Sequence, residues 1–117
     1  MPLLNTNNEV AMSLSKLHNQ VEARIARFLV NDLLSRGLIV SILHEEGLEV
    51  ERSQNKNEIC LGMAATDIDW VRVHDPVLSK TIGVFMLVYG NGEDLLSDHS
   101  DNRLCNEIAD KVYDKFY

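Results

Sequence analysis

The longest periodic pattern in the chain is a stripe of apolar residues in its N-terminal third. Apolar side chains recur at spacings of three and four from Val10 to Leu33, which is the period of one face of an amphipathic helix. Arg36 and Gly37 follow as a typical helix end. The pattern predicts a helix of about 24 residues, roughly 36 Å long at 1.5 Å per residue. Residues 1–9 lack periodicity and are expected to form a flexible leader.

This predicted helix is long for a chain of 117 residues. Its first half is therefore expected to extend beyond the core and to leave an apolar face uncovered. The apolar positions of that half are Val10, Leu14, Leu17 and Val21. We expect these residues to pack on a second copy of the chain in a homodimer.

Two short strands are expected after the first helix. Residues 38–43 are apolar and rich in branched side chains, and residues 48–52 alternate between apolar and charged. Both patterns are typical of β-strands. The polar turn 44–47 between them ends in glycine, so these segments together predict a β-hairpin.

A second helix and three more strands follow along the chain. Asn55 and Glu58 have the spacing of a capping box, and Thr66–Asp67 is expected to close the helix that they open. The strands are expected at residues 68–73, 81–89 and 93–98, the last of them at an edge. The 81–89 segment is the most apolar, so we expect it to be the central strand. Gly83 within it indicates a bulge or a close backbone approach.

The chain ends in a third helix. Its apolar residues run at a spacing of four from Leu104 to Phe116, and Ser100 or Asp101 is expected to cap it. The order is helix, two strands, helix, three strands, helix, and the short links between consecutive strands favour antiparallel pairing. This order predicts one α+β domain over residues 10–117, with a largely antiparallel five-stranded sheet and helices packed on one face.

Composition excludes several classes of protein. Hydrophobic residues make up 45% of the chain, which argues against a disordered protein. No apolar run is long enough to span a membrane, and no secretory signal is expected at the N-terminus. Cys60 and Cys105 are too few for a disulfide framework and lack the spacing of metal ligands. We interpret them as reduced, buried thiols of a cytoplasmic protein.

Charge is unevenly distributed along the chain. The net charge is -7, with 18 acidic and 11 basic side chains. Residues 1–42 contain 3 acids and 4 bases, whereas residues 43–117 contain 15 acids and 7 bases. An acidic body of this kind argues against direct binding of nucleic acid, which needs clustered lysines and arginines. It is compatible with docking to a basic partner.

The candidate interaction surface is acidic with one large aromatic residue. Its members are Glu45, Glu46, Glu49, Glu51, Trp70, Glu93 and Asp94. The first four form an acidic hairpin, which is either a solvated strand face or a docking surface for a basic partner. Trp70 is either buried or, if it is exposed, an interface anchor.

No catalytic residue, metal ligand or cofactor-binding residue is assigned. His74–Asp75 and Asp98–His99 each join an imidazole to a carboxylate, but such pairs act as a site only if they converge in space. The Gly90–Gly92 tract is read as a hairpin turn, because it is too short to hold a phosphate group. No cofactor is expected.

Several tracts of this sequence resemble a family of small uncharacterised proteins encoded by phages and prophages. The main tract is Gly83–Asn91, which contains LVYGN, and it is followed by Glu93–Asp94 and Ser97–Asp98. The matching tracts upstream are Leu33–Gly37, Ser41, Leu48–Ser53 and Thr66–Asp69, the last with the pattern T-D-x-D. The resemblance covers residues 24–102. Members of the family often carry a D-G-E turn where this chain has His44–Gly47. The resemblance implies a phage or prophage gene context and no particular activity.

Three functional hypotheses are consistent with the sequence. The first is a non-catalytic accessory protein that binds another, unidentified protein and forms a homodimer. The second is an inhibitor that mimics nucleic acid and blocks a host defence or DNA-handling protein, which requires carboxylates over one continuous face. The third is a small enzyme or ligand-binding domain, which requires His74, Asp75, Asp98 and His99 to line one pocket.

Overall fold

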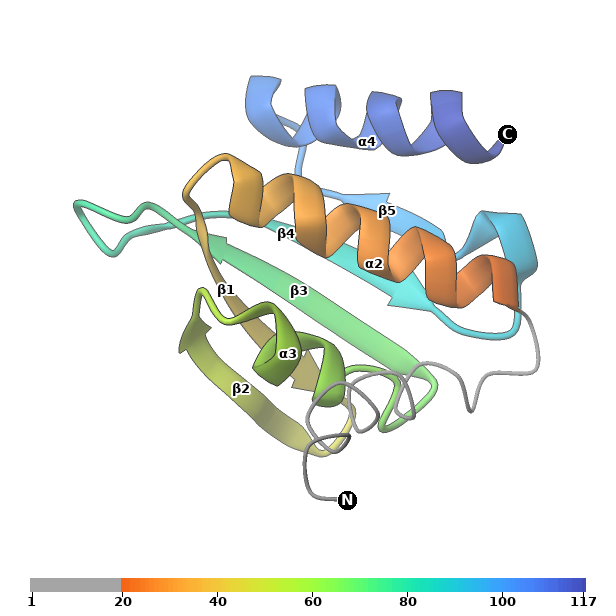
Figure 1. Cartoon of the computed structure of the whole chain (residues 1–117), viewed down its shortest axis with the longest axis horizontal. Helices are drawn as coiled ribbons and strands as arrows, with labels where there is room; N and C mark the ends of the chain where they lie inside the picture. The colour runs from red at the N-terminus through yellow and green to blue at the C-terminus, as the bar shows by residue number, and fades with distance from the viewer. Residues whose placement is uncertain (1–19) are drawn as a thin grey trace, which may run out of the picture.

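The computed structural model describes residues 20–117 and has the expected α+β architecture (Figure 1). Its elements are α2 (Gln20–Ser35), β1 (Ile39–His44), β2 (Gly47–Ser53), α3 (Lys56–Leu61), β3 (Ile68–His74), β4 (Thr81–Val88), η2 (Gly92–Asp94), β5 (Leu96–His99) and α4 (Arg103–Phe116). The expected leader 1–9 and the dimer residues Val10, Leu14 and Leu17 lie outside the described residues.

The five strands form one antiparallel sheet in the order β2-β1-β3-β4-β5. Within residues 20–117, helices α2, α3 and α4 cover one face of it (Figure 1). The expectation that residues 81–89 form the central strand was wrong, because β3 lies in the middle. The connection through α3 returns the chain past β2 to the free edge of β1, and β4 then adds to β3. Apolar content reflects burial of the strand and does not fix its position in the sheet.

The core lies between the inward face of the sheet and the helices. One stripe of α2 is buried, and its members are Glu22, Ala23, Ile25, Ala26, Leu29, Val30 and Leu33. Val40, Val71 and Phe85 face this stripe from the sheet and are fully buried. Val21 is partly buried and packs against the same core, so this member of the expected dimer face contacts its own chain.

The second helix is shorter than expected. The Asn55 side chain accepts a hydrogen bond from the Glu58 backbone N–H, as the capping spacing predicts. The helix ends at Leu61 and not at Thr66–Asp67. A Cβ on Gly62 would lie 2.4 Å from Val50 Cγ2, so the chain passes directly against β2 at this point and turns away.

The segment after β4 also differs from the expectation. Residues 93–98 do not form one strand, because η2 takes up Gly92–Asp94 and β5 begins at Leu96. The Glu22 carboxylate explains the difference. Its Oε2 accepts hydrogen bonds of 2.8 Å from the backbone N–H groups of Gly90, Asn91 and Gly92. This contact curls the loop around the beginning of α2 before the last strand starts.

The last helix is capped by Asn102, and not by Ser100 or Asp101. The Asn102 side chain accepts a hydrogen bond from the Cys105 backbone N–H. The Ser100 hydroxyl instead accepts a hydrogen bond from the Val84 N–H. Gly83 fulfils the expectation of a close approach, since a Cβ there would lie 2.3 Å from Cys105 Sγ.

Candidate functional site: the outer sheet face

The face of the sheet that the helices of residues 20–117 leave uncovered is unusually apolar. An antiparallel sheet with one covered face normally presents polar residues on the other. Here the alternate positions of β1, β3 and β4 present partly exposed apolar side chains, which we call the outer face: Leu43, Ile68, Trp70, Val84, Met86 and Val88. None of the six belongs to the buried core or packs against it.

Strand register brings these side chains together. Trp70 lies between Leu43 on β1 and Met86 on β4 as their directly paired residue. Side chains directly opposite one another on one face of antiparallel strands are in contact range. The exposed side chain of Arg72 is paired with Val84 next along the strands. Trp70 is therefore the centre of a contiguous apolar band across three strands.

A shallow pocket of about 230 Å³ opens beside this band. It is lined by Trp70, Val84, Met86, Asp98, His99 and Ser100. The exposed Asp98 is paired with Met86 at the sheet edge. His99 is partly exposed and stacks on the Phe85 ring, with 6.2 Å between ring centroids. The pocket thus combines an aromatic wall with one carboxylate and one imidazole at its rim.

The two His–Asp pairs do not meet in this pocket. Both histidines are paired with residues of β4: His74 with Thr81, and His99 with Phe85. These positions are four residues apart along β4, which is roughly 14 Å at about 3.4 Å per residue. The Asp75 side chain is used locally, because it accepts hydrogen bonds from the N–H groups of Val77 and Leu78. The one-pocket arrangement required by the enzyme hypothesis is absent from the described residues.

His74 is instead part of a buried hydrogen-bonded group. Its Nε2 lies 2.8 Å from Ser41 Oγ and its Nδ1 lies 3.1 Å from Thr81 Oγ1. The Ser41 oxygen also accepts a hydrogen bond from the Arg52 backbone N–H. Burial, together with the charges of Arg52 and Arg72, lowers the pKa of His74. These contacts join β1, β2, β3 and β4.

The acidic candidates fall into two groups on either side of Trp70. Glu45, Glu46, Glu49 and Glu51 are exposed on the β1–β2 hairpin. Within the described part of the chain, only Glu49 of these four has an ionic contact, 2.9 Å from His44. Glu93 and Asp94 lie in η2, beyond the end of β4. Asp94 accepts a hydrogen bond from the Tyr117 hydroxyl, which raises the pKa of Tyr117 to about 12. The seven predicted residues therefore do not form one continuous patch.

Sequence reasoning missed a buried carboxyl group at the beginning of β3. Asp69 Oδ2 accepts hydrogen bonds from the Tyr89 hydroxyl, at 2.6 Å, and from the Ala64 N–H, at 2.8 Å. Its Oδ1 is buried and has no hydrogen-bond partner among residues 20–117. Burial raises the pKa of Asp69 despite these hydrogen bonds. The tracts T-D-x-D and LVYGN supply Asp69 and Tyr89, so two separate tracts of the phage resemblance meet here.

Other features of the described residues bear on the chemistry. Cys60 and Cys105 are free and buried, as expected, and burial raises the pKa of both thiols. Residues 20–117 contain no cluster of three metal-binding side chains. No helix in the same range has the length and apolarity that crossing a bilayer requires. Comparison with known proteins yields no match, whether to a family model, to a curated protein or to a solved structure.

Proposed function

We propose that this protein is a non-catalytic accessory protein of phage or prophage type that acts by binding another protein through its outer sheet face. The observation that carries the proposal is that both faces of a single sheet are apolar. One face forms the core, and the other presents Trp70 and its neighbours to solvent. Exposed apolar patches of this kind are typical of interaction surfaces.

Trp70 is the anchor of the proposed interface. Tryptophan is enriched among residues that dominate binding energy, especially near the centre of an interface. The nearby hairpin acids, of which Glu45, Glu46 and Glu51 have no ionic contact among the described residues, favour a partner with basic residues at its rim. A nucleic-acid mimic is less well supported, because the lysines and arginines of α2 and α4 interrupt any continuous acidic face.

Site-specific crosslinking tests this proposal. A photoreactive phenylalanine analogue is placed at Met86 on the outer face and, as a control, at Val77, which is 85% exposed on a loop. Both proteins are irradiated in the cells that carry the gene. We expect a crosslinked partner from position 86 that is absent from position 77 and is lost when Trp70→Ala is added.

A folding control separates binding from stability. Trp70 lies outside the core, so Trp70→Ala should change the free energy of unfolding by only about 1 kcal/mol. The same crosslinked product from both positions, or one that persists in the stably folded Trp70→Ala variant, would contradict the proposal.

A further inference from the structure

A groove of about 510 Å³ runs between α2 and α4 and is basic, although the chain as a whole is acidic. Two phenylalanine rings and four cations line it: Phe28, Phe116, Arg24, Arg27, Lys111 and Lys115. The rings meet edge to face, with centroids 5.6 Å apart. The groove therefore combines an aromatic floor with cationic walls.

Most of this positive charge is not neutralised within the described chain. Arg24 and Lys115 lie over the aromatic rings, at 5.5 to 5.8 Å from the centroids. Neither they nor Arg27 form an ion pair with a described carboxylate. Lys111, the fourth cation of the lining, is paired with Asp32, which also pairs with Arg36. Three cations thus remain available for an anionic ligand.

The β1–β2 hairpin has the opposite character. The carboxylates of Glu45, Glu46 and Glu51 are exposed and have no cationic partner among the described residues. Leu48 lies among them and is 54% exposed. The hairpin therefore presents an apolar side chain surrounded by acids, which matches an aromatic floor surrounded by bases.

We propose that the groove between α2 and α4 binds the acidic β1–β2 hairpin of a second copy of this chain. Leu48 contacts the phenylalanine floor, and the hairpin carboxylates contact Arg24, Arg27 and Lys115. The numbers of charges without an ion pair within residues 20–117 agree, with three acids on the hairpin and three bases in the groove. The groove lies on the helix side of the molecule, whereas the hairpin borders the outer sheet face, because Leu48 is paired with Leu43 of that face. The hairpin acids are also the ones that we placed at the rim of the proposed interface, so a second copy and another protein would compete for them.

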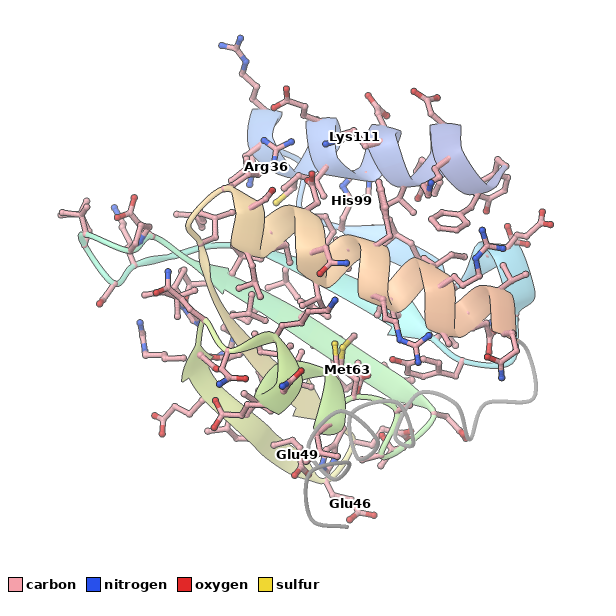
Figure 2. The ribbon with its side chains drawn as sticks, viewed as in Figure 1. Arg36, Glu46, Glu49, Met63, His99 and Lys111 are labelled. Carbon is pink, nitrogen blue, oxygen red and sulfur yellow. The ribbon has the colours of Figure 1, made fainter. Side chains whose placement is uncertain are left out.

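The placement of the two surfaces determines the form of the assembly. β2 is one edge strand of the sheet, whereas α4 packs on β4 and β5 at the opposite edge. Figure 2 shows Glu46 and Glu49 at one end of the molecule and Arg36 and Lys111 at the other. A contact between such opposed surfaces is head-to-tail and leaves one free surface at each end. Such an association closes into a ring of several copies or continues as an open chain, so we expect assemblies larger than a dimer.

Sedimentation equilibrium of the full chain tests the proposal. At low salt the weight-average mass should rise with concentration and pass that of a dimer. Raising the ionic strength to about 0.5 M should weaken association on the order of tenfold, because exposed charge pairs are screened. A chain that stays monomeric, or a mass that levels off at the dimer, would overturn the proposal.

Complementary charge reversals identify the surfaces. The groove variant carries Arg24→Glu and Lys115→Glu, and the hairpin variant carries Glu45→Lys and Glu46→Lys. Each should be monomeric alone, because one of its two surfaces is lost. Mixed together they should associate again, since the intact hairpin of the groove variant fits the intact groove of the hairpin variant. The two reversed surfaces are also complementary in charge, so the mixed complex contains both variants in equal amounts.

A matched control accounts for net charge. Lys80→Glu with Arg103→Glu makes the same charge change as the groove variant, at exposed positions away from both surfaces. This control should associate like the original chain. Loss of association in the control, or failure of the mixed variants to form a complex, would overturn the proposal, and circular dichroism verifies that every variant is folded.

Discussion

Gly83→Ala should destabilise the protein by displacing the last helix, which forms one wall of the basic groove. The new Cβ would lie 2.3 Å from Cys105 Sγ, whereas ordinary contact begins at 3.4 Å. The sulfur must therefore move by about 1 Å. Cys105 is fully buried in the first turn of α4, and its N–H is held by the Asn102 cap. Overpacking of this kind typically costs 1–3 kcal/mol, and we expect about 3 kcal/mol here because the cap limits movement.

Removal of the sulfur should relieve the clash. Cys105→Ala alone leaves a small cavity and should cost about 1 kcal/mol, similar to the loss of one buried methyl group. In the double variant the new methyl group occupies the space of the sulfur. We expect the double variant to lose only about 1 kcal/mol, so the coupling energy between the two positions is about 3 kcal/mol.

Urea unfolding of the four proteins under reducing conditions measures this coupling. The dependence of free energy on urea should be the same for all four, since the fold is unchanged. Gly90→Ala is the control. A Cβ added at Gly90 has no neighbouring atom within 4 Å, so only the backbone φ of +102° opposes this substitution. Cys105→Ala should not rescue it. Additive costs at positions 83 and 105, within about 0.5 kcal/mol, would refute the steric argument.

Three further predictions concern buried polar groups, and urea unfolding measures all of them. Glu22→Ala should lower the free energy of unfolding by about 3–5 kcal/mol, because three backbone N–H groups lose their shared carboxylate. The control Glu107→Ala, on the surface, should lower it by less than about 0.5 kcal/mol. Similar losses of stability in the two variants would contradict this prediction. The raised pKa of Asp69 makes the folded state bind a proton more tightly, so its contribution to stability should decline as the pH rises above 3.8. Asp69→Asn should remove this decline, and an unchanged pH profile would argue against it. The lowered pKa of His74 has the opposite effect, so stability should fall as the pH drops below 6.5, and His74→Gln should lose that dependence; the reasoning fails if the variant retains it.

The sequence by itself determined the class of the fold and most of its elements. The helical period that ends at Gly37, the alternation at residues 48–52 and the final stripe from Leu104 each correspond to an element of the structure. These features were predictable because side-chain period reflects which face of one element is buried. The Asn55 cap was predictable for a similar reason, since its partner is only three residues away.

Errors occurred where a distant residue decides the local structure. The last strand begins late because Glu22, some 70 residues earlier in the chain, binds the loop that precedes it. The central position of β3 depends on the path of the chain through α3 and not on its own composition. Such contacts leave no local period in the sequence.

The candidate surfaces were decided by tertiary structure in the same way. Trp70 was found from its residue type, but its apolar neighbours come from separate strands whose register cannot be read from any one of them. The basic groove was hidden for two reasons. Its cations belong to helices at opposite ends of the chain, and the net charge of -7 obscures a local excess of positive charge. Sequence patterns report the burial of single elements, whereas a binding surface arises only when several elements are packed side by side.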